Sequence, residues 1–191
     1  MESVLAGRVW KFGDNISTDL LCPQSYLRAQ AAGGIAALRA WMAAPDPALA
    51  AAHCMRASRP GWAAQVAPGD ILIAGRNFGC GSSRNGAEPL KTLGIAAVIV
   101  ESAARIYLRN SINTGLPTLV CPGIAGLAQE GEQVRVDLIS GEVRNEGTGV
   151  TRQGDRWEPG SPPAQILMAG GFLPFFEAKL RAAGLITGSS A

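Results

Sequence analysis

The sequence predicts an α/β protein, and two patterns in the chain carry that prediction. Continuous apolar runs at 71–74 and 95–100 are typical of parallel strands covered on both faces. The segment between them ends at Gly94, a helix stop signal, so strand, helix and strand form a βαβ unit. From 130 to 157 apolar residues alternate with polar ones, which indicates short antiparallel strands joined by glycine-containing turns.

The N-terminal third is predicted to hold one strand and a long irregular segment. Residues 7–12 alternate in hydropathy like a short strand, and Gly13-Asp14-Asn15 ends it as a turn. The segment 28–60 is rich in alanine and glycine, which indicates helical pieces broken by turns. We expect this segment to form a mobile loop or a lid.

The C-terminal half is predicted to continue the α/β pattern on both sides of the antiparallel strands. Apolar residues at helical spacing indicate a helix at 102–110, and the run at 116–120 indicates a third buried strand. Residues 166–174 are expected to form a closing helical element. An amphipathic helix is predicted at 175–183, and the tail at 187–191 is expected to be flexible.

Length and composition fix the domain count and exclude several function classes. A chain of 191 residues is expected to form a single domain, 1–191, with its core at 7–175. The net charge of +2 gives no basis for nucleic-acid binding. No apolar stretch reaches membrane-spanning length and no signal-peptide pattern is present, so we expect a cytoplasmic protein with no membrane contact.

The cysteines and the single histidine do not form a metal-binding pattern. Cys22, Cys54, Cys80 and Cys121 are scattered without a Cys-x-x-Cys pair, and a reducing compartment keeps such residues as thiols. His53 is interpreted as an ordinary helix-surface or loop residue. We therefore expect no metal ligands and no histidine-based catalytic pair in this chain.

The segment 77–86, Asn-Phe-Gly-Cys-Gly-Ser-Ser-Arg-Asn-Gly, gives the strongest indication of a functional site. It connects the predicted strand at 71–74 to a predicted helix. Gly79 and Gly81 have no Cβ, so the loop can adopt positive φ and bring its backbone N–H groups close to an anion. The sequence therefore predicts an anion-binding loop.

The side chains that follow these glycines suit an acidic ligand. Arg84 offers a planar pair of donors to a carboxylate or phosphate, and Ser82 and Ser83 add hydroxyl donors. A nucleotide-binding P-loop is a poor alternative because Arg84 follows the serines, whereas that motif places a lysine before them. A loop that only caps the following helix is the other interpretation of these residues.

A second polar loop also has two interpretations. It gathers side-chain oxygens at Asp14, Asn15, Ser17, Thr18 and Asp19. In the first interpretation these oxygens accept hydrogen bonds from the backbone of their own loop, as in an Asx-type turn. In the second, Asp19 faces the functional site.

Several segments between Gly7 and Gly123 occur in the order and spacing of one known family. They are 7–14 (Gly-Arg-Val-Trp-Lys-Phe-Gly-Asp), 18–19 (Thr-Asp), 26–28 (Tyr-Leu-Arg), 68–70 (Pro-Gly-Asp), 77–84, 104–106 (Ala-Arg-Ile) and 109–117 (Arg-Asn-Ser-Ile-Asn-Thr-Gly-Leu-Pro). With these segments the chain resembles the small subunit of 3-isopropylmalate dehydratase, which is similar to the swivelling C-terminal domain of aconitase and homoaconitase.

The resemblance implies a fold, a partner and a cofactor. The fold is a single β/β/α swivelling domain of the aconitase C-terminal type. The chain is expected to dock on a large dehydratase subunit that carries a [4Fe-4S] cluster, with the cluster ligands on that partner and the active site at the interface. In this family one iron acts as a Lewis acid on the substrate and a serine alkoxide of the small subunit is the base. Ser82 matches that serine.

The resemblance also assigns roles around Ser82. Arg84 is expected to bind a substrate carboxylate, with Ser83 beside it, while Gly79, Gly81 and Asp19 support the loop. The loop N–H groups, the N-terminus of the following helix and the guanidinium all favour negative charge on the serine.

Two segments bear on the substrate, which is expected to be a small hydroxy di- or tricarboxylic acid. Tyr26-Leu27-Arg28 matches a loop that contacts the variable group of the substrate, and Arg28 favours an additional carboxylate or polar group over isopropyl. A solvent-facing arginine is the other interpretation. Asn85-Gly86 stand where the family usually has Glu-His, which changes charge and hydrogen bonding beside the loop.

The predicted function is therefore the small subunit of a heteromeric [4Fe-4S]-dependent hydro-lyase, similar to 3-isopropylmalate dehydratase and inactive without its large subunit. A homoaconitase-like or dimethylmalate dehydratase-like small subunit is the alternative within the same chemistry. From another class, the alternative is a non-catalytic carboxylate-binding domain that has kept the anion loop.

Overall fold

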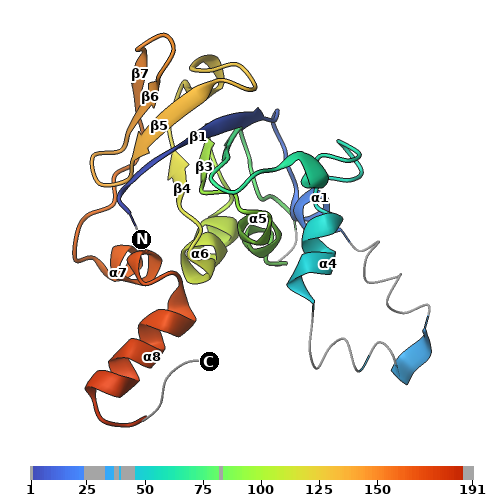
Figure 1. Ribbon diagram of the computed structural model, residues 1–191, viewed down its shortest axis with the longest axis vertical. Helices are drawn as coiled ribbons and strands as arrows, with labels where there is room; N and C mark the ends of the chain where they lie inside the picture. The colour runs from blue at the N-terminus through green and yellow to red at the C-terminus, as the bar shows by residue number, and fades with distance from the viewer. Residues whose placement is uncertain (1, 24–32, 37–38, 40–45, 82–83, 187–191) are drawn as a thin grey trace.

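A seven-stranded mixed sheet organises the chain (Figure 1). The computed structural model describes residues 2–23, 33–36, 39, 46–81 and 84–186. The strands are β1 (Val4–Lys11), β2 (Ile71–Ala74), β3 (Ala97–Val100), β4 (Thr118–Val120), β5 (Gln133–Asp137), β6 (Glu142–Asn145) and β7 (Thr151–Gln153). The helices are α1 (Thr18–Leu21), α4 (Pro47–Ala52), α5 (Ala87–Leu93), α6 (Arg105–Thr114), α7 (Pro162–Met168) and α8 (Phe172–Ala182), with short 3-10 helices η1 (Ala63–Gln65) and η2 (Ile124–Gly126).

The sheet has a parallel half and an antiparallel half that share β1. Its strand order is β4-β3-β2-β1-β5-β6-β7. β1 pairs in parallel with β2, with Val9 opposite Ile71, and antiparallel with β5, with Gly7 opposite Val134. The predicted parallel βαβ unit and the predicted antiparallel strands after residue 130 are both confirmed.

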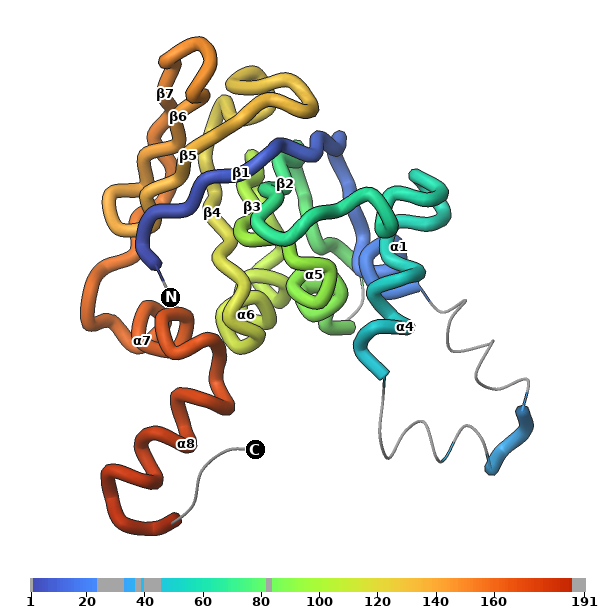
Figure 2. Tube along the Cα trace, in the orientation of Figure 1, coloured from blue at the N-terminus to red at the C-terminus, as the bar shows by residue number. Residues whose placement is uncertain are grey.

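Alternate side chains of the parallel strands build two separate cores. Leu72 and Val98 point toward α5 and α6 and join the core on that side. Ile71 and Ile99 point to the opposite face, where they share a core with Val134 of β5. One core thus contains residues of both halves, so the sheet is curled and its antiparallel half covers the far face of the parallel strands. Figure 2 shows β5, β6 and β7 on one side of β1 and α5 and α6 on the other.

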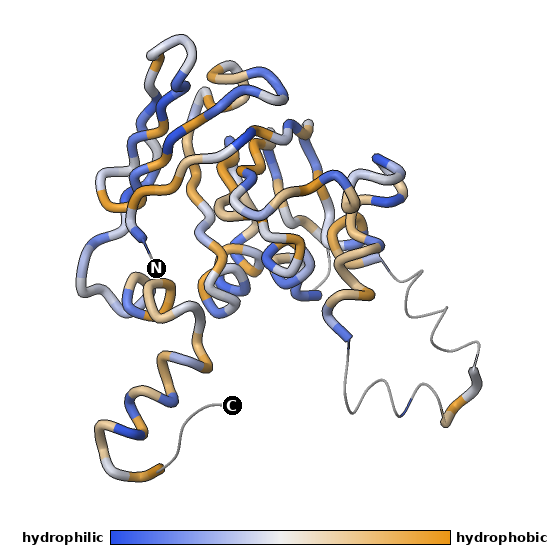
Figure 3. The backbone as a smooth tube through the Cα atoms, viewed as in Figure 1, coloured by the Kyte–Doolittle hydropathy of each residue, from blue (hydrophilic) through white to orange (hydrophobic). Residues whose placement is uncertain are grey.

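The distribution of hydropathy follows this arrangement. Figure 3 shows hydrophobic residues concentrated along the central strands and hydrophilic residues at the outer end of the antiparallel half. Every residue of β2 and β3 is buried, as expected for parallel strands covered on both faces. Burial of each large side chain contributes roughly 1.5–3 kcal/mol. It stabilises the strands that precede the segment 75–86, called the glycine loop here.

Some helix boundaries differ from the sequence prediction, for identifiable reasons. α8 begins at Phe172 rather than 175, because Pro174 falls in the first helical turn, where no intrahelical N–H bond is needed. α6 begins at Arg105 rather than 102. Residues 102–104 are held in extended form against the loop after β2, with the Ala104 N–H donating to the Phe78 carbonyl at 2.8 Å.

The predicted lid and tail lie partly or wholly outside the described residues. Within 28–60 the structure describes α4, whose C-terminal end is capped by His53 with its Nδ1 3.0 Å from the Leu49 carbonyl oxygen. The segments 24–32, 37–38, 40–45 and 187–191 are not described. None of the described helices is long and apolar enough to cross a membrane.

An ion pair with a buried carboxylate lies just before β2. Asp70 is 4% exposed and accepts hydrogen bonds from Arg8 Nη2 at 2.6 Å, Trp10 Nε1 at 2.7 Å and the Ala67 N–H at 2.9 Å. Burial works to raise the pKa of Asp70, but these hydrogen bonds outweigh it and hold the pKa below its usual value. The carboxylate therefore joins β1 to the turn that leads into β2.

Candidate functional site

The glycine loop continues the direction of β2 and is paired on both sides. Its first part, residues 75–81, is called the anchored limb here. A parallel bridge joins Cys80 to Ser17 and another joins Phe78 to Ala103. The Cys80 carbonyl also accepts a hydrogen bond from the Thr18 N–H at 2.8 Å. The backbone of this limb is therefore fixed up to the residue before Gly81.

Side chains of the second polar loop tie it to the anchored limb. Asp14 Oδ1 accepts a hydrogen bond from the Arg76 N–H at 2.7 Å, and Asn77 Nδ2 donates to Asn15 Oδ1 at 2.9 Å. These bonds join segments far apart in sequence. The Asx-turn interpretation is therefore wrong for Asp14 and Asn15, because their oxygens serve the neighbouring loop instead of their own.

The two central glycines adopt the backbone conformation that the loop prediction required. Gly79 has φ +72° and Gly81 has φ +104°, a region that other residues rarely occupy. A Cβ at Gly79 would overlap the buried side chain of Tyr107. Gly81, in contrast, is exposed, so the loop reaches the surface at the point where Ser82 follows.

Arg84 lies where the loop returns to the body of the protein. Its Nη1 donates to the Cys22 carbonyl at 3.1 Å, and its Nη2 forms an ion pair with Asp19. The Asp19 side chain is 64% exposed, whereas that of Arg84 is 24% exposed. The structure thus brings together two residues that the sequence proposed for the site, Asp19 of α1 and Arg84 at the end of the loop.

Residues 84–86, called the returning limb here, connect the loop to α5. Asn85 Nδ2 donates to Thr114 Oγ1 at 3.0 Å, and Asn85 Oδ1 accepts from the Ala87 N–H at 3.3 Å. Because α5 starts only at Ala87 and its first N–H is already bonded, the helix terminus contributes less to the site than the sequence suggested.

Three residues assigned from sequence lie outside the described part of the chain. These are Ser82, Ser83 and Arg28. The structure describes the exposed Gly81 before the serines and the partly buried Arg84 after them. The roles of the two serines and of Arg28 stay predictions.

A pocket of about 550 Å³ lies beside the returning limb. Asn85, Thr114 and Lys91 contribute to its lining. Lys91 Nζ donates to the carbonyls of Thr114, at 2.5 Å, and Gly170, at 2.8 Å, and burial lowers the pKa of this amine. These contacts were not predicted from the sequence. Gly115, a helix stop signal, indicated that α6 ends at Thr114, but not that Thr114 lies beside the returning limb.

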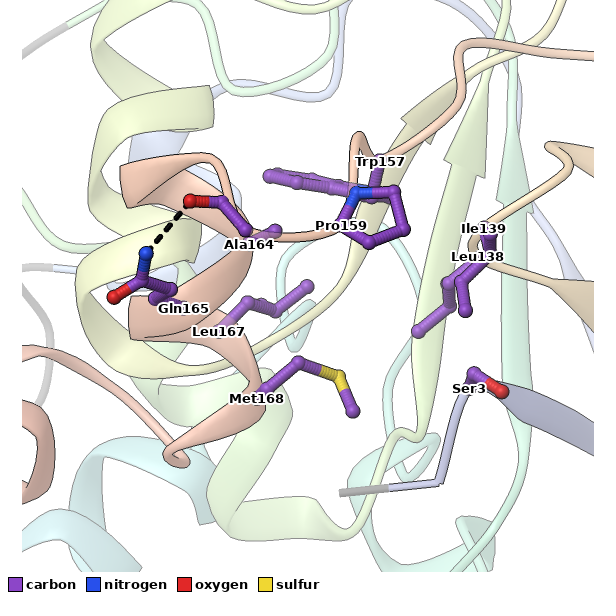
Figure 4. Close-up of a pocket in the computed structure, with 10 residues that line it drawn as sticks. Ser3, Leu138, Ile139, Trp157, Pro159, Ala164, Gln165, Leu167 and Met168 are labelled. Carbon is purple, nitrogen blue, oxygen red and sulfur yellow. Dashed lines mark hydrogen bonds between the residues drawn. The ribbon is translucent and has the colours of Figure 1, made fainter.

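A second pocket, of about 200 Å³, has a different character (Figure 4). Leu138, Trp157, Leu167 and Met168 surround it, between the end of β5 and α7. Its lining includes no charged side chain among the described residues. It therefore does not suit an acidic ligand, in contrast to the surroundings of Arg84.

The comparisons with known proteins agree with this fold. A family model described as the aconitase C-terminal domain matches residues 60–123, which contain β2, the glycine loop, α5, β3, α6 and β4. The site-bearing part of the chain is thus of the aconitase C-terminal type. A crystal structure of 3-isopropylmalate dehydratase from Methanocaldococcus jannaschii superposes with a TM-score of 0.80 at 32% identity, over 95% of this chain and 98% of that one.

Curated relatives narrow the class further. The isopropylmalate/citramalate isomerase small subunit of Methanocaldococcus jannaschii is 40% identical over 181 residues, 94% of this chain and 98% of the relative. The methanogen homoaconitase small subunit of Methanothermobacter thermautotrophicus is 44% identical over 146 residues, 76% of this chain and 75% of the relative. The chain belongs to the family of small subunits of 3-isopropylmalate dehydratase and related aconitase-family enzymes.

Within the described ranges, no three His, Cys, Asp or Glu side chains lie together as ligands for a metal ion or an iron–sulfur cluster. Burial raises the pKa of the Cys54 thiol above its usual range and that of Cys121 to about 11. Without a metal ion, both are therefore neutral thiols near neutral pH.

Proposed function

We propose that the chain is the small subunit of a two-subunit hydro-lyase that dehydrates or isomerises a small hydroxy di- or tricarboxylic acid in the cytoplasm. Family membership supports the reaction class. The observation that carries the proposal to this chain's own residues is the Arg84–Asp19 pair, because it presents a guanidinium already bound to a carboxylate at the exposed end of an anchored glycine loop.

The large subunit is the partner that holds the [4Fe-4S] cluster in this proposal. The scattered cysteines support this division, because the described residues bring no three potential metal ligands together. The present chain contributes the loop that closes over the substrate from the opposite side.

Ser82 is the base that takes the carbon-bound proton of the substrate. Its oxygen needs negative charge to do so, and a serine hydroxyl loses its proton only where the surroundings favour the anion. The positive φ of Gly81 supports this role, because it can turn backbone N–H groups toward the serine oxygen, whereas the Gly79 N–H is already bonded to the Ile16 carbonyl. The positive charge of Arg84, two residues later, acts in the same direction.

Arg84 binds a substrate carboxylate by exchange with Asp19. An exposed ion pair contributes only about 0–1 kcal/mol, so opening it costs little. The substrate carboxylate then takes the place of the Asp19 carboxylate at the guanidinium, while the Cys22 carbonyl keeps its hydrogen bond from Nη1. Asp19 serves to hold the guanidinium in place when no substrate is bound.

A homoaconitase-like substrate is the second candidate within this reaction class. The relative named as a homoaconitase small subunit favours it, as does Arg28, whose charge suits an additional carboxylate. Turnover of a tricarboxylate against a dicarboxylate with an isopropyl group distinguishes the two.

Co-expression with the cluster-bearing large subunit tests the proposal. We expect dehydratase activity from the purified pair and a loss of about 10²–10⁴ in kcat for Ser82→Ala, because the general base is removed. Ser140→Ala, in the β5–β6 turn, is the matched control and should leave kcat unchanged. Full activity of Ser82→Ala would refute the base role.

Two further results would refute the enzyme assignment itself. One is a wild-type pair, with its cluster intact, that turns over neither substrate class. The other is binding of a carboxylate by the isolated chain, measured by calorimetry, that the large subunit does not change. That result would instead support the non-catalytic carboxylate-binding domain.

A further inference from the structure

The two limbs of the glycine loop are held in different ways. Backbone hydrogen bonds fix the anchored limb, including those from Gly79 to Ile16 and from Thr18 to Cys80. The returning limb is held largely by side chains, through the bonds of Arg84 and Asn85 described above. The returning limb therefore depends on side chains that mutation can remove without changing the backbone pairing of the anchored limb.

Asn85 is bonded to a fixed point. Its Nδ2 donates to Thr114 Oγ1 at 3.0 Å, and that hydroxyl lies 3.4 Å from Asn85 Oδ1. Thr114 is the last residue of α6, and Lys91 of α5 holds its carbonyl. Both partners are partly buried, where a hydrogen bond is electrostatically stronger than in water.

Gly86 allows the returning limb to take this position. It is buried against α1, and a Cβ at this residue would lie 2.8 Å from Leu21 Cδ1, closer than real Cβ contacts. With any other residue at this position, either the Leu21 side chain or the limb would have to shift. Asn85 and Gly86 therefore work as a unit, with the glycine providing room and the asparagine providing the bond.

We infer that Asn85 is a positioning residue that acts through its hydrogen bond to Thr114, so that the returning limb holds Ser82 in its reactive position. The inference rests on the proposed role of Ser82 as the base. Displacement of a reacting group by about 1 Å can cost about 10²-fold in rate. Loss of the bond should therefore reduce kcat far more than it reduces substrate binding through Arg84.

The test uses the complex with its large subunit. Thr114→Val removes the hydroxyl and nearly keeps the shape, and we expect kcat to fall about 10- to 100-fold with KM changed less than about threefold. Thr114→Ser restores the hydroxyl and should recover most of the lost turnover. Asn85→Ala should match Thr114→Val, and the double variant should be no worse than either single one.

Thr92→Val is the matched control, because Thr92 lines the same pocket and has no hydrogen bond to the loop among the described contacts. Normal kcat in Thr114→Val, with Ser82→Ala inactive in the same complex, would overturn the inference and leave the proposed function intact. If Thr114→Val fails to fold or its complex lacks the cluster, Asn85→Ala takes its place in the comparison. Independent, multiplying losses in the double variant would also overturn the inference.

Discussion

Two arginine–aspartate pairs stand at opposite ends of the same region of the sheet, and they differ chiefly in burial. Before β2, Arg8 and Asp70 meet at 2.6 Å, with the Asp70 side chain 5% exposed and the Arg8 side chain 39% exposed. After the glycine loop, Arg84 pairs with Asp19, whose side chain is 64% exposed. The same two side-chain types thus occur twice, once with a buried carboxylate and once with an exposed one.

Burial determines what each pair can do. Asp70 has protein donors on both carboxylate oxygens, so no external acid can replace it without leaving Trp10 Nε1 and the Ala67 N–H unpaired. Asp19 faces solvent and loses little when another carboxylate takes its place. The buried pair is therefore structural, and the exposed pair is suited to bind a substrate.

Replacing the buried carboxylate should give the largest effect on stability. In Asp70→Asn the charge is lost while Arg8, Trp10 and the Ala67 N–H still point at the site, so we expect the free energy of unfolding to fall by about 2–4 kcal/mol. Urea denaturation of the full chain measures this value. A decrease of less than about 1 kcal/mol in the free energy of unfolding would mean that this ion pair is as weak as a surface ion pair.

The pH dependence of that difference has a definite sign. Because the folded pKa of Asp70 is lowered, its stabilisation is fully present above its unfolded pKa of about 4 and is lost as pH falls through the lower folded value. The gap between wild type and Asp70→Asn should therefore shrink on acidification and stay constant between pH 5 and 8.

The exposed carboxylate should give the smallest effect. Asp19→Asn removes the charge, but keeps an acceptor oxygen, at one of the two described anchors of Arg84, and we expect a change of less than about 1 kcal/mol in stability and a rise of about two- to fivefold in KM. Steady-state kinetics of the complex measure the rise. If turnover instead fell by about two orders of magnitude, that would contradict an orienting role and place Asp19 in the chemistry.

Much of the fold was predictable from the sequence because its signals are local. The apolar runs of β2 and β3 and the stop at Gly94, which has φ +95°, required only neighbouring residues to interpret. The start of α8 was not predictable in the same way, since Pro174 is a helix breaker in the interior but is tolerated in the first turn.

The site was predictable in its residues more than in its contacts. Asp19 and Arg84 were both proposed, but nothing in the sequence showed that they pair with each other. The bonds of Asp14 to the Arg76 N–H and of Asn85 to Thr114 join segments that only the curled sheet and α6 bring together. Such contacts depend on tertiary structure, which residue patterns do not encode locally.

The most direct measurement of the central claim is the kinetic effect of Arg84→Gln in the complex, beside its unfolding free energy. If Arg84 binds the substrate, kcat/KM should fall about 10- to 100-fold, because each charge-assisted bond to a carboxylate contributes about 1.5–3 kcal/mol. The free energy of unfolding should change by less than about 1 kcal/mol, because the Arg84–Asp19 pair is exposed. Unchanged kcat/KM, or a loss of stability as large as that of Asp70→Asn, would contradict the assignment of Arg84 to the substrate.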